Sequence, residues 1–402
     1  MSLWGGAKLS RIQLEAPSIN DTKIAQGQQP VRTRRKILHI VGCMSRGGVE
    51  TWLMHILRNI DRNQFELHFF VNSQVECAYD KEILSLGGRI HYGGHPGNPV
   101  RYAREFAEVV REHGPFDALH SHVYWFSGFV AWLGHRAGIP IRIAHSHTAV
   151  SARAWKAHRR TYQGLMRWLI ARYATHKIGV SRQAGEALFG HRSAKPYKLL
   201  HYGMDFRPYL QQQPVEKLKE CFGIPPARKI VGHVGRFVRV KNHAFIVDFF
   251  DRLIANGVDA HLLLVGDGPL APAVKAQVEA RALSERCTFA GLQADVAPFF
   301  SAMDVFVLPS LWEGLPLVSF EAQAAGVPVI ASTAVPDEVS AIPRLVERLP
   351  LSDGADGWAA VVSRTLAEPS RRRGDEPLLL QASSFGLPAC LQVLNSIYSQ
   401  SD

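Results

Sequence analysis

The sequence predicts an α/β protein made of two similar halves, each a parallel sheet wound with helices on both faces. Residues 36–41 form a continuous apolar strand, of the kind that is buried on both faces of a parallel sheet. A Gly-rich turn at 42–48 follows, and apolar residues then recur at helical spacing over 49–60. The second half restarts in the same way, with a strand at 229–234 and a turn that opens at Gly235. Strands that alternate with helices predict two Rossmann-like domains facing one cleft.

The other strands are expected in chain order. They lie at 66–71, around Ile90, and at 118–120, 141–144 and 177–180 in the first half, and at 262–265, 287–290, 305–308 and 327–330 in the second. A hinge is expected near residues 203–205, before the polar linker 211–214. We therefore expect a mostly disordered basic arm at 1–35, an N-terminal Rossmann-like domain at 36–204, a C-terminal one at 205–385, and a final helical segment at 386–402.

Composition excludes several classes of protein. The 402 residues are 47% hydrophobic, as in an ordinary globular protein, and no apolar run reaches the roughly 18 residues that a membrane-spanning helix needs. No secretory signal is visible at the N-terminus. The five cysteines contain no CxxC pair, so we expect reduced thiols in a cytosolic protein, with no disulfide framework or zinc site.

The net charge of +11 is concentrated in one segment. Residues 151–200 hold eleven Lys and Arg against one acid, Glu186. Within this segment Tyr162, Leu165, Met166, Leu169, Ile170 and Tyr173 fall on one helical stripe, with Trp155 and Trp168 nearby. Such a basic amphipathic helix fits an anionic membrane surface. Alternatively, the stripe packs on the domain core and leaves the arginines in water.

The segment from Trp312 to Glu321 carries the most specific chemistry. Glu313 stands in a tight Gly/Pro loop after the strand 305–308, and Glu321 follows eight positions later in a helical run. Pro316 suits the first turn of that helix, because its missing N–H would be unpaired there anyway. The free amides near Leu317 would then attract an anion such as a diphosphate. A carboxylate that faces two vicinal hydroxyls can accept a hydrogen bond from each, as in a sugar or ribose clamp.

These two glutamates, with Gly-Leu-Pro after the first and the Gly-x-Pro-Val strand 326–329 after the second, resemble the signature of retaining glycosyltransferases of family 4, which have the GT-B fold. The resemblance covers about residues 36–335, and the stretches 120–148 and 232–238 are most similar to exopolysaccharide-type members. It implies that 36–204 is the acceptor-side domain, that 205–385 is the nucleotide-sugar donor domain, and that the helical segment 386–402 returns to the N-terminal domain. It implies that Glu313 holds sugar hydroxyls or the phosphate side of a nucleotide-sugar, and that Glu321 holds the ribose. The alternative is a surface acidic pair around a core strand.

A second motif, residues 235–242, supplies two cations after a buried strand. Gly235 lets the backbone approach a phosphate, and Arg236 and Lys241 follow closely. A nucleoside diphosphate leaving group gains charge as the glycosidic bond breaks, so fixed cations stabilise the transition state. The resemblance assigns Arg236 and Lys241 this role without a metal ion or other cofactor. A merely solvated basic loop is the alternative.

Further positions follow from the resemblance. Gly47 and Gly48 resemble the loop that approaches the donor phosphate and the acceptor, and Gly266 and Leu292 belong to loops that line the base pocket in the family. One departure is Tyr202, where many relatives have Asn. The expected donor-binding residues are therefore Gly47, Gly48, Gly235, Arg236, Lys241, Gly266, Leu292, Glu313, Gly314, Leu315, Leu317 and Glu321.

Two histidine pairs, His120/His122 and His145/His147, follow strands of the first half. Period-two spacing points both members of a pair to one side, which is compatible with a metal site, but no Asp or Glu completes a ligand set nearby. His122 matches the position from which family members contact the donor sugar, although a structural histidine is the alternative. Glu313, Arg236, Lys241 and His122 are the candidate catalytic residues, and no metal is expected.

The resemblance implies a hexosyltransferase that uses a nucleotide-sugar and a glycan or polyprenyl-diphosphate-linked acceptor. It would act in the cytoplasm, in peripheral contact with the inner face of the membrane through residues 151–200. A basic membrane- or nucleic-acid-binding protein without catalysis is the second hypothesis, but no recognised nucleic-acid module is present, so no nucleic-acid partner is expected. A dinucleotide oxidoreductase is disfavoured, because no Gly-x-Gly-x-x-Gly with a later acidic ribose ligand occurs.

Overall fold

The computed structural model describes residues 34–94, 96–148, 157–190, 196–211, 213–369 and 372–400. Most of the expected basic arm at 1–35 therefore lies outside the described residues. So do residues 151–156 and 191–195 of the basic segment.

Among the described residues, seven parallel strands form the first sheet, in the order β3-β2-β1-β4-β5-β6-β7. The strands are β1 (Arg35–Val41), β2 (Phe65–Val71), β3 (Arg89–Tyr92), β4 (Ala118–Ser121), β5 (Ile141–Ser146), β6 (His176–Gly179) and β7 (Lys198–Leu199). Their helices are α1 (Gly48–Asn59), α2 (Asp80–Ser85), α3 (Pro99–His113), α4 (Ser127–Arg136), α5 (Ala157–Tyr173) and α6 (Arg182–Phe189).

The second sheet has six parallel strands within the described ranges, in the order β10-β9-β8-β11-β12-β13. They are β8 (Lys229–Val234), β9 (Ala260–Val265), β10 (Cys287–Gly291), β11 (Val305–Leu308), β12 (Val329–Ser332) and β13 (Val346–Leu349). The helices of this half are α7 (Val215–Cys221), α8 (His243–Ala255), α9 (Ala271–Ala280), α10 (Ala297–Ala302), α11 (Leu317–Ala324), α12 (Gly354–Ala367) and α13 (Glu376–Ala382), and the chain ends in α14 (Leu387–Tyr398), which packs on the first sheet. The predicted fold class is confirmed.

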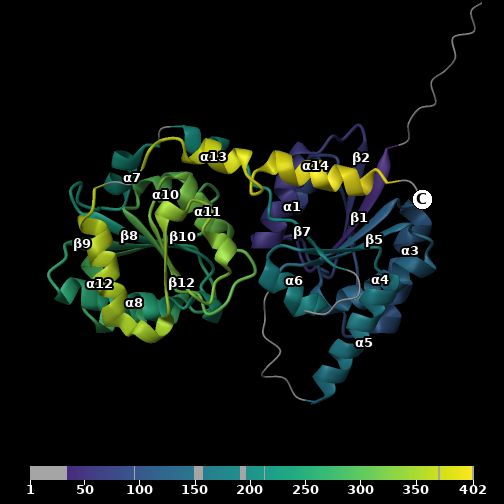
Figure 1. Cartoon of the computed structure of the whole chain (residues 1–402), viewed down its shortest axis with the longest axis horizontal. Helices are drawn as coiled ribbons and strands as arrows, with labels where there is room; N and C mark the ends of the chain where they lie inside the picture. Colours follow the sequence, from purple (N-terminus) through teal and green to yellow (C-terminus); the bar gives the residue numbers. More distant parts are fainter. Residues whose placement is uncertain are drawn as a thin grey trace, which may run out of the picture. The chain divides into compact units, whose positions relative to one another are not determined.

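Alternation along each strand distributes its side chains to two core layers. In β9, Leu262 and Leu264 pack with α8, α9 and α12, whereas Leu263 and Val265 pack on the other face with α7 and α10. Figure 1 shows α8 and α12 together beside this sheet. Because both faces are covered by helices, the strands are largely apolar, although buried histidines such as His39 in β1 and His261 in β9 interrupt them. The sequence analysis did not identify β7 and β13, which are short and lack a buried pattern.

The hinge segment pairs with the segment through which the chain returns. Met204 N–H donates to Phe385 O at 2.9 Å, and Leu387 N–H donates to Met204 O at 2.9 Å. Helix α14 then lies beside α1, as Figure 1 shows, and its apolar residues join the core of the first sheet. A side chain at Gly203 would collide with Cys390 of α14. The two crossings between the sheets are therefore adjacent and close-packed.

Helix α5 packs most of the predicted apolar stripe on the domain core. Gln163, Met166 and Ile170 are buried, and the last two pack in the core that α5 shares with α4. Tyr162, Leu165 and Trp168 remain exposed. The alternative of packing on the core therefore holds for Met166, Leu169, Ile170 and Tyr173. It does not hold for Tyr162 and Leu165, because Gln163 takes the inward position in that turn. Over the part of the chain that the structure describes, we find no helix with the length and apolarity to span a membrane.

Candidate functional site

In each sheet, the strand order reverses at one point, and that is where open α/β sheets bind ligands. In the first sheet this point lies between β1 and β4, followed by the Gly-rich turn 42–48 and by His122. In the second it lies between β8 and β11, followed by the loops 235–242 and 309–316. The Gly-rich turn and the two loops with the most specific motifs therefore follow the strands at the switch points, whereas the loops of Gly266 and Leu292 follow β9 and β10.

A cavity of about 260 Å³ lies at these strand ends. It is lined by Gly48, Val49, Glu50, His147, Thr148, Tyr202, Val240, Trp312, Glu313, Gly314 and Leu315. Four of the expected donor-binding residues are in this lining: Gly48, Glu313, Gly314 and Leu315. The cavity thus draws on loops that lie far apart in the sequence.

An ion pair joins the two most specific motifs. The ammonium of Lys241 donates to Oε1 of Glu313 at 2.7 Å, and both side chains are largely buried. The N–H of Leu311 donates to Val240 O at 2.8 Å, which ties the loop after β8 to the loop after β11. Asn242 has φ +58°, a left-handed conformation that Asn tolerates well, and its side-chain amide donates to Pro309 O. The pair is therefore held by main-chain contacts on both sides.

Arg236 lies in the same loop, but its side chain is exposed. Neither Arg236 nor Lys241 is among the residues that line the cavity, and Lys241 reaches it through its contact with Glu313. Gly235 and Gly266 pack against each other: Gly266 has φ +128°, and a side chain there would strike the Gly235 carbonyl. The two glycines allow the loops after β8 and β9 to approach closely.

The loop around Gly314 packs against the end of β5. The Ser181 hydroxyl donates to Gly314 O at 2.7 Å, and a side chain at Gly314 would run into the carbonyl of His147. Leu315 and Leu317 are buried in the apolar core, which leaves their main-chain atoms as the groups for a ligand. Helix α11 begins at Leu317 and Pro316 precedes it as N-cap, one position earlier than expected. The amides at the start of α11 follow Gly314 directly.

Glu321 lies one turn into α11, outside the cavity lining. Burial raises the pKa of its carboxyl to about 7 against a hydrogen bond from Tyr209, and nearby Asp295 raises the pKa further. The structure therefore places Glu321 in an acidic, desolvated corner between α11 and the loop after β10. Leu292 belongs to that loop and is exposed, and Arg46 of the Gly-rich turn donates to Gln293 O at 3.4 Å.

Glu50 is a cavity residue that the sequence analysis did not assign. It lies in the first turn of α1, after the N-cap Gly47 and Gly48, and its carboxylate folds back so closely that a side chain at Gly47 would strike it. Burial raises the pKa of Glu50. An acid in the first turn of a helix is a general helix signal, so the pattern alone did not distinguish it.

The histidine pairs join a larger cluster at the ends of β1, β4 and β5. His122 Nε2 lies 3.1 Å from His39 Nδ1, and His122 Nδ1 lies 2.8 Å from His147 Nε2. Both ring nitrogens of His122 are therefore engaged, and His147 is the histidine that lines the cavity. Period-two spacing indicated a shared side of the sheet but not which ring reaches the cavity. The role of His122 stays a prediction.

The expectation that all cysteines are reduced thiols is wrong for one pair in the structure. Cys43 and Cys77 are joined, and Cys221, Cys287 and Cys390 are free. The paired residues follow β1 and β2, which are neighbours in the sheet. Their separation of 34 residues matches no short motif, so sequence spacing did not reveal the contact. The reduced-thiol argument for a cytosolic protein does not apply to this pair.

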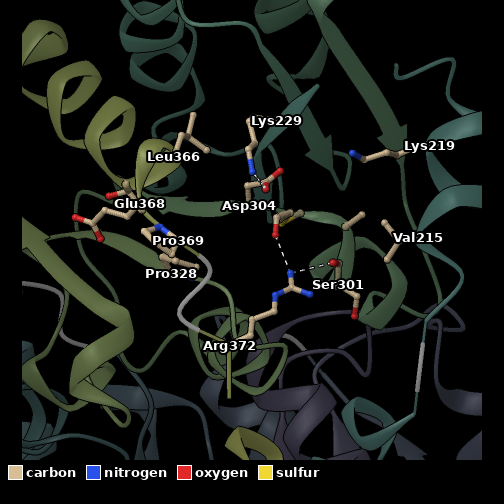
Figure 2. A pocket seen from close by; sticks show the side chains of 13 residues that line it. Val215, Lys219, Lys229, Ser301, Asp304, Pro328, Leu366, Glu368, Pro369 and Arg372 are labelled. Carbon is tan, nitrogen blue, oxygen red and sulfur yellow. Dashed lines mark hydrogen bonds and ion pairs between the residues drawn. The ribbon is translucent and has the colours of Figure 1, made fainter. Parts of the chain in front are cut away.

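A second cavity, of about 290 Å³, opens at the opposite ends of the strands of the second sheet. Figure 2 shows Lys229 directed at Asp304, and Arg372 donating to main-chain oxygens, including Ser301 O. Lys229 begins β8, and Asp304 immediately precedes β11. In this cavity the side chains of Lys229 and Arg372 are thus bound by protein groups. The residues that the sequence predicts to bind the donor or act in catalysis lie at the other end of the strands.

Two Rossmann-like domains with parallel sheets, and a cavity at their switch points, define a GT-B protein. The family profile "Glycosyl transferase 4-like domain" matches residues 47–203, and "Glycosyl transferases group 1" matches residues 228–368. EpsF of Bacillus subtilis (strain 168), a protein named as a glycosyltransferase, is 36% identical over 346 residues, 85% of this chain and 90% of EpsF. The chain therefore belongs to the group 1 glycosyltransferases.

Two further relatives extend the likeness. CapH of Staphylococcus aureus, a capsular polysaccharide biosynthesis glycosyltransferase, is 24% identical over 302 residues, 74% of this chain and 81% of CapH. The crystal structure of Anabaena HepE in complex with UDP-glucose has a TM-score of 0.74 at 19% identity, and the match covers 90% of this chain and 99% of HepE. The structural likeness supports the GT-B fold.

Proposed function

We propose that this glycosyltransferase moves a hexosyl unit from a nucleotide-diphosphate sugar to a glycan or polyprenyl-diphosphate-linked acceptor, with retention, in exopolysaccharide or cell-surface polysaccharide synthesis. The Lys241–Glu313 pair at the switch-point cavity is the observation that carries the proposal. Relatives support two parts of this proposal, the nucleotide-sugar donor and the role in polysaccharide synthesis. HepE was solved with UDP-glucose, and CapH is named for capsular polysaccharide biosynthesis.

In this proposal Lys241 stabilises the diphosphate as it leaves. Its ammonium is largely buried, so its charge acts across a medium less polar than water. The leaving phosphate gains charge in the transition state, and a cation fixed beforehand favours that state over the ground state. Arg236 is exposed in the same loop and would add a second cation when the donor is bound. The main-chain amides at the start of α11 would complete the phosphate site.

The carboxylates would then hold hydroxyl groups. Glu313 lines the cavity and is oriented by Lys241, so it fits the sugar hydroxyls or the phosphate side of the donor. Glu321 is buried beside Tyr209 and fits the ribose. A carboxylate accepts two hydrogen bonds from vicinal hydroxyls only when it is charged, so donor binding would favour ionised Glu321. No metal takes part in this proposal, because Lys241, Arg236 and the amides supply the positive charge.

We propose further that α5 contacts the anionic inner face of the cytoplasmic membrane. Tyr162, Leu165 and Trp168 are 42%, 52% and 57% exposed, and Arg160 and Arg172 are exposed on the same helix. Exposed aromatic and aliphatic side chains beside arginines suit the interface of an anionic bilayer. Trp168→Ser should reduce sedimentation with vesicles that contain phosphatidylglycerol, without reducing nucleotide binding. Equal sedimentation of both proteins would contradict this contact.

Two measurements test the proposed transfer reaction. Thermal melts with UDP-, GDP- and ADP-sugars should reveal one that raises the melting temperature, because a ligand that binds only the folded state stabilises it. NMR of the glycosylated product should then show the anomeric configuration of the donor, in buffer with EDTA as well as without it. A product of inverted configuration would contradict retention, and activity lost to EDTA would contradict the metal-free reaction.

A further inference from the structure

A hydrogen-bonded series runs from the cavity into the interior of the first domain. Tyr202 Oη lies 2.8 Å from His147 Nδ1, His147 Nε2 lies 2.8 Å from His122 Nδ1, and His122 Nε2 lies 3.1 Å from His39 Nδ1. Tyr202 and His147 line the cavity, whereas His39 is fully buried in β1. The proposed function assigns no role to Tyr202 or His39.

The donor–acceptor directions of the hydrogen bonds in this series depend on one another. A neutral imidazole has one N–H donor and one acceptor nitrogen, so each ring passes the direction of its hydrogen bond to the next ring. Either every N–H points toward Tyr202 or every one points away. The last nitrogen, His39 Nε2, is buried and has no hydrogen-bond partner among the described residues. Buried N–H groups are very rarely left unpaired, so the direction that leaves His39 Nε2 as a bare acceptor is favoured.

In that direction the Tyr202 oxygen accepts the N–H of His147, and its own O–H is left to donate. We propose that this hydroxyl binds a sugar hydroxyl in the cavity, oriented by His147, His122 and His39. The inference rests on the proposed function, because it takes the cavity as the sugar site. It makes Tyr202 a sugar-binding residue and the three histidines positioning residues.

The histidines of this series stay neutral at physiological pH. They therefore orient the Tyr202 O–H group and do not take up a proton. Burial lowers the pKa of both His39 and His147 to about 3, and lowers that of His122 well below its ordinary value. Burial, together with the carboxylates of Glu50 and Glu313, raises the pKa of Tyr202. Both carboxylates therefore act on the phenol that faces the cavity. A neutral O–H donor is the form that a sugar oxygen requires.

A second series in the same cluster provides an internal control. His145 Nδ1 lies 3.1 Å from His120 Nε2, and His120 Nδ1 lies 2.7 Å from Tyr398 Oη. It also ends in a tyrosine, and His145 Nε2 is its unpartnered nitrogen among the described residues. Tyr398 lies on α14 in the apolar core and does not line the cavity. Removing the Tyr398 hydroxyl thus breaks a similar hydrogen-bond network at a distance from the proposed sugar site.

The same histidines offer an alternative use as metal ligands. Two sets, His39/His120/His122 and His122/His145/His147, each bring three ring nitrogens within 4.8 Å of one another. Hydrogen bonds occupy most of these nitrogens, and each bond joins a nitrogen to one definite partner. Hydrogen bonds between neutral rings account for this arrangement without a metal ion. Both ligand sets consist of histidines alone, so no carboxylate would balance the charge of a buried divalent cation.

The test compares Tyr202→Phe with Tyr398→Phe. The first keeps the ring that stacks on His147 at 5.5 Å and removes the hydroxyl alone. If the hydroxyl binds the donor sugar, Tyr202→Phe should weaken binding of the nucleotide-sugar selected in the thermal screen by about tenfold, the size of one hydrogen bond, and leave binding of the free nucleoside diphosphate unchanged. If it binds the acceptor, the KM for acceptor should rise by about tenfold instead. Tyr398→Phe should change neither.

Unchanged donor binding and unchanged acceptor KM in Tyr202→Phe would overturn the inference. A wild-type protein that binds no nucleotide-sugar would instead contradict the proposed function, so the two failures are distinguishable. His39→Phe should reproduce the effect of Tyr202→Phe, and the two should not add in the double variant. If His39→Phe does not fold, nitrogen-15 NMR of the wild-type protein tests the series instead. It should show His147 protonated at Nδ1 and unchanged between pH 6 and 8, whereas a titrating signal or stoichiometric bound metal would refute the series.

Discussion

Lys241 Nζ lies 2.7 Å from Glu313 Oε1, although 72 residues separate the two in the sequence. The contact forms because β8 and β11 are neighbours at the switch point of the second sheet, so the loops after them meet. Side-chain exposures of 16% and 13% mean that neither charge is well solvated. Each side chain therefore holds the other in position before any donor arrives.

Lys241→Ala should abolish most of the transfer activity. The variant loses the cation beside the leaving diphosphate, and removal of one preorganised charge or donor commonly costs about 100- to 1,000-fold in kcat. It also leaves Glu313 largely buried without its cation, so we expect a loss of stability of about 1–3 kcal/mol. Steady-state kinetics and urea unfolding measure the two effects.

A charge exchange separates the two effects. The double variant Lys241→Glu with Glu313→Lys keeps an ion pair at this place and should recover part of the stability that either single variant loses. Its activity should stay low, because a carboxylate now stands where the diphosphate needs a cation. Recovered activity would mean that the pair is structural only and that Lys241 does not act on the donor.

Gly314→Ala should reduce both stability and activity. An added methyl group would run into the carbonyl of His147, and main-chain atoms on both sides leave little room to adjust. Glu313 would then shift, and we expect at least a tenfold loss of kcat/KM with a stability loss of about 1–3 kcal/mol. Gly164→Ala is the matched control, because its methyl group would meet nothing within 4 Å at an exposed position of helix α5, where Ala is preferred by about 1 kcal/mol. Equal melting temperatures for the two variants would contradict the predicted clash.

Local patterns were sufficient to predict the strands at the switch points. The segments 36–41 and 305–308 are apolar except for Lys36 and His39 and end in Gly or Pro turns, so buried parallel strands were the natural interpretation. Lys241 and Glu313 were each assigned to a ligand from their own motifs. Their contact with each other was not predicted, because it depends on which strands become neighbours.

The residues that the sequence did not reveal reach the site through tertiary structure. Tyr202 lies near the hinge and His147 at the end of β5, and both enter the cavity lining only once the first sheet has formed. Glu50 looks like an ordinary acid at the start of a helix. On α5, helical spacing identified an apolar stripe, but the choice of Gln163 as the inward residue depends on packing against neighbouring elements.

The buried histidines should make the protein sensitive to acid. Burial lowers the pKa of both His39 and His147 to about 3, so the unfolded chain, with ordinary values near 6.5, takes up protons first as the pH falls. The stability due to these neutral rings is complete above pH 6.5 and declines from there toward pH 3. Each should lose about 1 kcal/mol between pH 7.5 and 5.5.

Urea unfolding at pH 7.5, 6.5 and 5.5 measures this decline. His39→Phe removes one titrating ring and should show a shallower dependence than the wild type. Tyr398→Phe removes a hydroxyl from the same cluster but no imidazole, so its dependence should be parallel to that of the wild type. A slope that His39→Phe does not reduce would show that His39 is not buried as a neutral ring.

Glu321→Gln should alter stability in the opposite pH direction. Burial and Asp295 raise the pKa of Glu321 to about 7, against an ordinary value of 4.5. The contribution of protonated Glu321 to the free energy of unfolding is full below pH 4.5. It declines as the pH rises and is lost above about pH 7. The wild type therefore gives up as much as about 3 kcal/mol across this window, and Gln, which cannot ionise, gives up none.

The difference in unfolding free energy between Glu321→Gln and the wild type cancels the histidine effect, since both proteins keep those rings. That difference should grow in favour of the variant from pH 5 to pH 8. Asp295→Asn removes a neighbouring charge that raises the pKa of Glu321, so it should move the window to lower pH. In the proposed donor site, wild-type affinity for the nucleoside diphosphate should rise with pH up to about 7, because only the ionised carboxylate accepts both ribose hydroxyls. A stability difference that stays constant over this range would contradict the burial of an ionisable Glu321.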